Sequence, residues 1–185
     1  MKRYVRIGRL RIFGARVYAH WSVFAAALVL LALFAETILV GIVAVLSYFG
    51  MILLHEAGHA YFAKRQHLDR LEIRLSAFHG VCVFEAPEYA EQEYIVAWGG
   101  VLAQLVVAIP LVLSKALFNF GAVDPWGPIV AILGYYSVAV VTFNLIPASG
   151  LDGENAWRLP PLLLRRWRRD RAAAGKRRGK LKLMK

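Results

Sequence analysis

The sequence contains a single cysteine, Cys82, among its 185 residues. One cysteine cannot form a disulfide within the chain, and it cannot supply the several thiolates of a cysteine-based metal site. Acidic residues are also few, because 12 aspartates and glutamates stand against 23 lysines and arginines, a formal net charge of +11. Any metal site must therefore be built from histidines and a small number of carboxylates.

Long stretches of the sequence have almost no charge at all. Apolar residues make up 59% of the chain, whereas a soluble domain has nearer half. The excess is concentrated in four segments with charged residues between them, namely residues 21–35, 38–63, 94–113 and 128–146. This pattern predicts an α-helical polytopic membrane protein with about four transmembrane helices. The first segment has no small-residue cleavage site after it, so we expect a retained helix rather than a signal peptide.

The basic residues are unevenly placed along the chain. Residues 1–20 carry six lysines or arginines and no acid, and residues 165–185 carry eleven with one acid, Asp170. In a four-span arrangement, 22 of the 23 basic residues fall on one side, Lys115 being the exception. The positive-inside rule makes this side the cytoplasm, with both termini there. We expect the basic termini to face anionic lipids of the cytoplasmic leaflet and not nucleic acid, although RNA binding by the tail is an alternative.

Two regions outside the apolar segments read as β-structure. Apolar and basic side chains alternate in residues 5–17, which favours a strand at the membrane interface. Residues 71–75 and 81–84 read as a small β-hairpin against the cytoplasmic face. The loop that holds this hairpin is too short for a separate domain. We therefore expect one membrane core over residues 1–164, followed by a basic cytoplasmic tail over residues 165–185.

Residues 55–59 follow the pattern HExxH. His55 and His59 are four residues apart, so on a helix they lie on one face and can bind one ion through neutral imidazole nitrogens. Glu56 beside them is placed to take a proton from metal-bound water. The alternative is a hydrogen-bonded polar cluster that joins helices. Charged residues inside a span cost about 3 kcal/mol each on insertion scales, so we favour a metal site, with Zn²⁺ as the ion.

Zinc needs a third protein ligand at the same depth in the membrane. Ile38 and His55 are seventeen residue steps apart, about 25 Å of helix. The ion would thus lie toward the cytoplasmic end of a core about 30 Å thick. The last apolar segment ends on that side, and Asp152 follows it closely enough to turn back toward the ion. Glu154 is the main competitor, and an ordinary turn aspartate is the alternative for Asp152.

These motifs together resemble the site-2 protease family of intramembrane zinc metalloproteases, over about residues 12–157. Residues 144–147 and 151–153, which read NLIP and LDG, match the family's second signature. The resemblance implies that Asp152 is the third zinc ligand and that Asn144 contacts the substrate backbone, a helix-end hydrogen bond being equally open for Asn144. Five positions depart from the family pattern without removing a ligand or the base: His79, Gly100, Gln104, Gly150 and Glu154.

The resemblance implies an intramembrane zinc metalloendopeptidase that cuts membrane-anchored proteins, as in regulated intramembrane proteolysis. Its partner would be a transmembrane protein substrate, and we expect a multi-pass protein in the cell membrane of a prokaryote. We also expect a minimal core without the family's PDZ or CBS domains. Two alternatives stay open. One is a catalytically inactive zinc-binding membrane scaffold or adaptor of the same fold, and the other is a small ion transporter, which would need polar groups through the bilayer.

Overall fold

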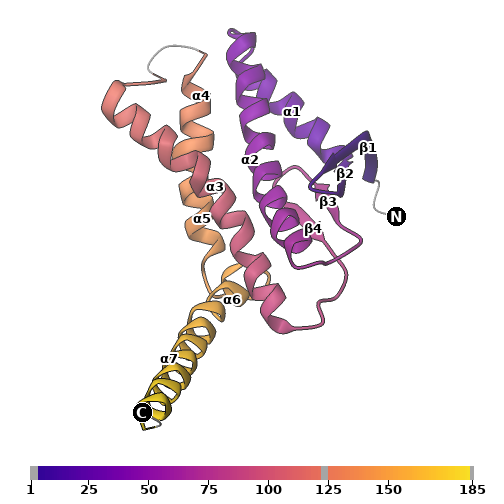
Figure 1. Cartoon of the computed structure of the whole chain (residues 1–185). Helices are drawn as coiled ribbons and strands as arrows, with labels where there is room; N and C mark the ends of the chain where they lie inside the picture. Colours follow the sequence, from indigo (N-terminus) through magenta and orange to yellow (C-terminus); the bar gives the residue numbers. More distant parts are fainter. Residues whose placement is uncertain (1–3, 122–124, 184–185) are drawn as a thin grey trace.

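The structure, a computed structural model, describes residues 4–121 and 125–183, with side chains up to residue 173. Its framework consists of long helices that run side by side (Figure 1). They are α2 (Ile38–Arg65), α3 (Ala90–Phe118) and a composite helix of α4 (Gly127–Ile129), the π-helical η1 (Val130–Tyr136) and α5 (Ser137–Asn144). Within the described residues, these 3 helices are long and apolar enough to cross a membrane. The prediction of a polytopic α-helical membrane protein is confirmed.

The first predicted span is shorter than the sequence suggested. Helix α1 (Trp21–Leu33) has 13 residues, about 20 Å at the helical rise, whereas the hydrocarbon core is about 30 Å thick. Strand β2 (Ala15–His20) ends at the residue before α1, so the helix begins at Trp21 as predicted and ends at Leu33, two residues before the predicted end. His20 caps the helix, because its ring accepts a hydrogen bond from the backbone N–H of Ser22. Three helices rather than four therefore have the length of a span, and α1 packs beside part of α2 (Figure 1).

The β-structure is a four-stranded sheet in the order β1-β2-β3-β4. The single strand expected at residues 5–17 is a hairpin of β1 (Tyr4–Ile12) and β2, because Phe13 and Gly14 turn the chain with φ of 50° and 92°. The predicted hairpin is present as β3 (Glu72–Leu75) and β4 (Gly80–Val83). β2 also pairs with β3 in parallel, which joins the two hairpins. β1 and β4 are thus the two outer strands of the sheet.

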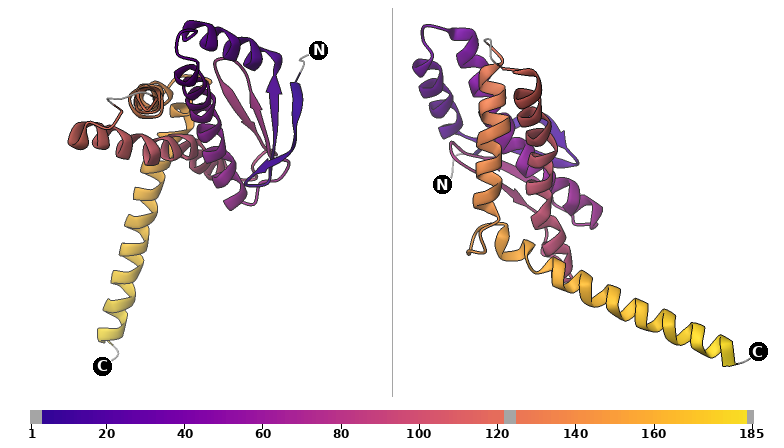
Figure 2. Two further views of the ribbon diagram at one scale, coloured as in Figure 1. Left: turned by 90° about the horizontal axis from the view of Figure 1, so that it is seen from above. Right: turned by 90° about the vertical axis from the view of Figure 1, so that its left-hand side faces the viewer.

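Helix α2 lies between this sheet and α3 (Figure 2). On the α3 side the two backbones touch, since a Cβ added to Gly58 would lie 2.2 Å from the carbonyl oxygen of Gly99. On the sheet side, buried apolar residues of β2 and β3 pack with Ala60 and Ala63 of α2. The same stretch of α2 is therefore enclosed from both sides, and it is the stretch that carries the HExxH pattern.

The chain leaves α5 through a short loop and two further helices, α6 (Gly153–Ala156) and α7 (Leu159–Leu183). α7 projects away from the helix bundle (Figures 1 and 2). The predicted boundary between residues 164 and 165 falls inside α7, so the tail is helical where it is described. The division into core and tail stays a prediction. Residues 1–3 and 184–185 of the basic termini lie outside the described residues.

Candidate metal centre

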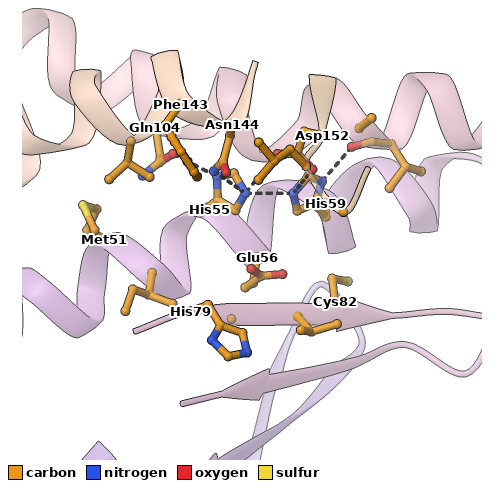
Figure 3. Close-up of a pocket in the computed structure, with 18 of the residues that line it drawn as sticks. Met51, His55, Glu56, His59, His79, Cys82, Gln104, Phe143, Asn144 and Asp152 are labelled. Atoms are coloured by element: carbon orange, nitrogen blue, oxygen red, sulfur yellow. Dashed lines mark hydrogen bonds and ion pairs between the residues drawn. The ribbon is translucent and has the colours of Figure 1, made fainter. Parts of the chain in front are cut away.

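Helix α2 carries the three residues of the HExxH pattern on unbroken helical backbone. His55, Glu56 and His59 are all buried, which is unusual for ionisable side chains without partners. The Nε2 atoms of the two histidines lie 3.1 Å apart, and the rings meet edge to face (Figure 3). The spacing in the sequence thus produces two imidazoles that converge on one point.

Asp152 approaches the same point from the loop after α5. One carboxylate oxygen lies 3.1 Å from Nε2 of His55, and the other lies 3.3 Å from Nε2 of His59 (Figure 3). The three residues form a group whose ligand atoms all lie within 4.8 Å of one another. Glu154, the competing candidate, accepts a hydrogen bond from the backbone N–H of Gly150 instead. The structure therefore brings together the three residues predicted to hold zinc.

Two tryptophans hold the loop that carries Asp152. The indole N–H of Trp98 on α3 donates to the carbonyl oxygen of Ala156 at 2.8 Å, and that of Trp157 donates to Leu145 at 2.7 Å. Their rings stack edge to face with centroids 5.9 Å apart. This pair, called the tryptophan clamp below, fixes the chain on both sides of Asp152.

The outer nitrogens of both histidines have hydrogen-bond acceptors. Nδ1 of His59 lies 2.8 Å from the backbone carbonyl oxygen of Val96, and Nδ1 of His55 lies 2.8 Å from Oε1 of Gln104. Because both partners can only accept, each Nδ1 carries the proton. In the neutral imidazoles, the Nε2 lone pairs then face each other and the Asp152 carboxylate. Three electron-rich groups converging in this way require a cation between them.

The distances fit a zinc ion. Ligand atoms about 2.1 Å from a tetrahedral zinc are about 3.4 Å from one another, close to the 3.1 and 3.3 Å separations between the imidazole and carboxylate atoms. Oδ2 of Asp152 is buried and has no hydrogen-bond partner among the described residues. The ionised carboxylate is the form that binds a cation.

Glu56 lies beside this group without joining it. Its side chain lies between the imidazoles and strand β4 (Figure 3). The strand comes very close, since a Cβ added to Gly80 would lie 2.4 Å from Cγ of Glu56. Glycine at position 80 therefore leaves the space in which the carboxylate sits. A buried carboxylate next to three metal ligands is the arrangement that a general base for metal-bound water requires.

The metal group opens onto a cleft of about 690 Å³, within the range of about 300–1,000 Å³ found for ligand pockets. Helix α2, the outer strand β4 and the end of α5 all contribute to its walls. Asn144 lies in this wall, with its amide nitrogen 3.5 Å from Nε2 of His55. Cys82 also lines the cleft, but burial and the nearby Glu56 carboxylate raise the pKa of its thiol to about 12. A thiol that keeps its proton is a poor zinc ligand.

Gln104 and Gly100 belong to the site although the sequence marked them only as departures from a family pattern. Gln104 is fully buried and orients His55, while its own amide nitrogen has no partner among the described residues. A Cβ added to Gly100 would lie 2.5 Å from Nε2 of His59 and 2.6 Å from Cε1 of His55. The sequence did contain a signal for the role of Gln104, because a polar residue inside an apolar span needs a hydrogen-bond partner in the protein.

Replacing Gly100 by alanine should weaken zinc binding. The added methyl group has no room beside the two imidazoles and must displace at least one of them from the ion. Zinc affinity, measured by competition with a chromogenic chelator, should fall at least about tenfold. Gly50→Ala on α2 is the matched control, because its Cβ would meet nothing within 4 Å. Equal zinc affinity in the two variants would contradict the placement of Gly100 against the ligands.

Replacing Trp98 by phenylalanine should loosen Asp152. The ring is kept, but the hydrogen bond to Ala156 is lost, and losing a hydrogen bond that helps to position a metal ligand typically costs about 10–100-fold in metal affinity. We expect a loss in that range with little change in the melting temperature of the metal-free protein. Trp126→Phe is the matched control and should leave zinc affinity unchanged, because Trp126 immediately precedes α4 and its ring contacts Phe120. A similar loss in both variants would argue against the clamp.

No protein-family model matches this chain. It is 30% identical over 118 residues to an inferred zinc metalloprotease of Synechocystis sp., a match that covers 63% of this chain and 31% of the relative. It is 29% identical over 106 residues to a zinc metalloprotease of Methanocaldococcus jannaschii, covering 57% of this chain and 30% of the relative. The chain thus spans about a third of the length of the curated relatives it matches.

A solved structure shares the fold. The site-2 protease from Methanocaldococcus jannaschii superimposes with a TM-score of 0.66 at 24% sequence identity, and the match covers 84% of this chain and 70% of that one. The sequence relatives, the shared fold and the His55, His59 and Asp152 group agree with one another. The motifs in the sequence predicted this relationship. The chain is therefore an integral membrane protein related to the zinc metalloproteases, with the fold of the site-2 proteases.

Proposed function

We propose that the protein is an intramembrane zinc metalloendopeptidase that hydrolyses peptide bonds of membrane-anchored proteins. The observation that carries the proposal is the position of Glu56, buried between a three-ligand metal group and the outer strand of a sheet that lines the cleft. A scaffold that only bound zinc would have no use for a buried carboxylate in this place, where it costs free energy.

Each residue of the site has a part in the proposed reaction. His55, His59 and Asp152 would hold the Zn²⁺ ion, which when bound lowers the pKa of a water toward about 7 and polarises a carbonyl group. Glu56 accepts the proton of the attacking water and passes it to the leaving amine. Asn144, at the wall of the cleft beside His55, donates its amide N–H to the substrate backbone.

Strand β4 offers a way to present the substrate. A carbonyl within a transmembrane helix is already hydrogen-bonded, so the substrate must unwind before it can be cut. β4 is one of the two outer strands of the sheet, and its residues Gly80 to Cys82 line the cleft. An extended substrate segment can add to such an edge through backbone hydrogen bonds. We place the cleft near the cytoplasmic face of a prokaryotic cell membrane, with both basic termini on that side.

Reconstitution tests this function. Purified protein in proteoliposomes would be incubated with a transmembrane peptide that carries helix-destabilising residues near one end, and cleavage would be followed by mass spectrometry. We expect cleavage that a zinc chelator stops and added zinc restores. Bound zinc without cleavage of any member of a panel of such peptides would favour the inactive scaffold instead.

A further inference from the structure

The first turns of α7 carry apolar side chains that the described residues leave half exposed. Leu163, Leu164 and Trp167 are 50%, 48% and 50% exposed. Trp167 is four residues after Leu163 and three after Leu164, so the three side chains lie along one side of the helix. Large apolar side chains gathered on one side of an exposed helix mark a contact surface rather than a solvated face.

The other sides of the same turns are strongly basic. Arg165, Arg168 and Arg169 are exposed, and none of them has a salt-bridge partner among the described side chains. Arg171 places its guanidinium over the Trp167 ring, 3.8 Å from the centroid, so its charge lies at the border of the apolar side. Asp170 is the only acid among residues 165–173. The surface is therefore amphipathic and positively charged.

The base of α7 is held in place on the bundle. Arg166 forms a two-point hydrogen-bonded ion pair with Glu91 at the start of α3. From there α7 runs sideways, away from the long helices rather than parallel to them (Figure 2). A helix with this direction extends outward from the end of the bundle, on the side where the bilayer surface would be if the long helices span the membrane (Figure 2).

We propose that α7 is a membrane-surface helix that binds anionic phospholipid headgroups. Leu163, Leu164 and Trp167 enter the headgroup boundary, and the neighbouring arginines contact the phosphates. This role goes beyond the proposed peptidase function and requires no catalytic step. The apolar side argues against nucleic acid as the ligand, because phosphate contacts alone would use the arginines and leave two leucines and a tryptophan in water.

Fluorescence quenching on the full chain in nanodiscs tests this inference. Trp167 emission is obtained as the difference between wild type and Trp167→Phe. Lipids brominated on their acyl chains quench only rings that enter the bilayer, and acrylamide quenches rings exposed to water. The charge variant combines Arg165→Glu, Arg168→Glu and Arg169→Glu. The matched control combines Arg6→Glu, Arg9→Glu and Arg11→Glu on strand β1, where all three arginines are exposed.

We expect brominated phosphatidylglycerol to quench Trp167 at least about twofold more than brominated phosphatidylcholine. This preference should disappear in the α7 charge variant, persist in the β1 control and weaken with added salt. Free access of acrylamide to Trp167 without quenching by either brominated lipid would overturn the proposal, as would equal quenching by both lipids. A change of Trp167 emission with added RNA but not with phosphatidylglycerol would assign the surface to nucleic acid.

Discussion

Replacing Glu56 by glutamine is expected to leave zinc bound and to reduce peptide cleavage by about 10²–10⁴-fold, the usual contribution of a general base. Glutamine has the shape of glutamate, so it fits the space between α2 and Gly80. Its amide cannot accept the proton of the attacking water. The three ligands are untouched, because Glu56 is not one of the groups that converge on the ion. The loss should therefore fall on kcat and not on zinc content.

The comparison needs zinc content and cleavage rate on the same preparations. Glu88→Gln, an exposed glutamate in the loop before α3, is the matched control and should behave as wild type. Cleavage that survives in Glu56→Gln would reject Glu56 as the base. Loss of zinc together with activity would mean that Glu56 holds the metal group together rather than moving a proton.

Replacing Asp152 by asparagine is expected to reduce zinc affinity by more than about 100-fold, since even changes outside the ligand shell cost about 10–100-fold. The substitution keeps size and removes the charge that two neutral imidazoles cannot supply. Asparagine also lacks one of the two oxygens that face the histidines at 3.1 and 3.3 Å. Activity should fall with the metal, and added zinc should restore part of it.

Asp69→Asn provides the control for this second variant, because Asp69 is an exposed aspartate in the loop after α2. It should bind zinc as wild type does. Isothermal titration of metal-free protein would give both affinities. An affinity within a few-fold of wild type for Asp152→Asn would show that another group supplies the third ligand, and Glu154 would then be the first residue to replace.

The parts of the site that rest on short sequence spacing were predictable. His55 and His59 share a helix face because four residues make about one turn, and no other part of the fold is needed to see it. Asp152 could be proposed because a helix has a fixed rise, so the depth of His55 in the membrane selected the chain end that could reach it. In both cases the regular geometry of a helix converts a difference in residue number into a distance.

The parts that rest on contacts between distant segments were not predictable. Gln104 and Trp98 reach the site because α2 and α3 touch at Gly58 and Gly99, and this contact sets the rotation of one helix against the other. The parallel pairing of β2 with β3 joins segments more than fifty residues apart.

X-ray absorption at the zinc edge would test most directly whether His55, His59 and Asp152 bind the zinc ion. The zinc-loaded protein should show only nitrogen and oxygen neighbours at about 2.0–2.2 Å, with the outer scattering typical of two imidazoles. The histidine signal should drop by half in His59→Gln. A sulfur neighbour at about 2.3 Å, which only Cys82 or a methionine could supply, or a spectrum without imidazole scattering, would contradict a site made of His55, His59 and Asp152.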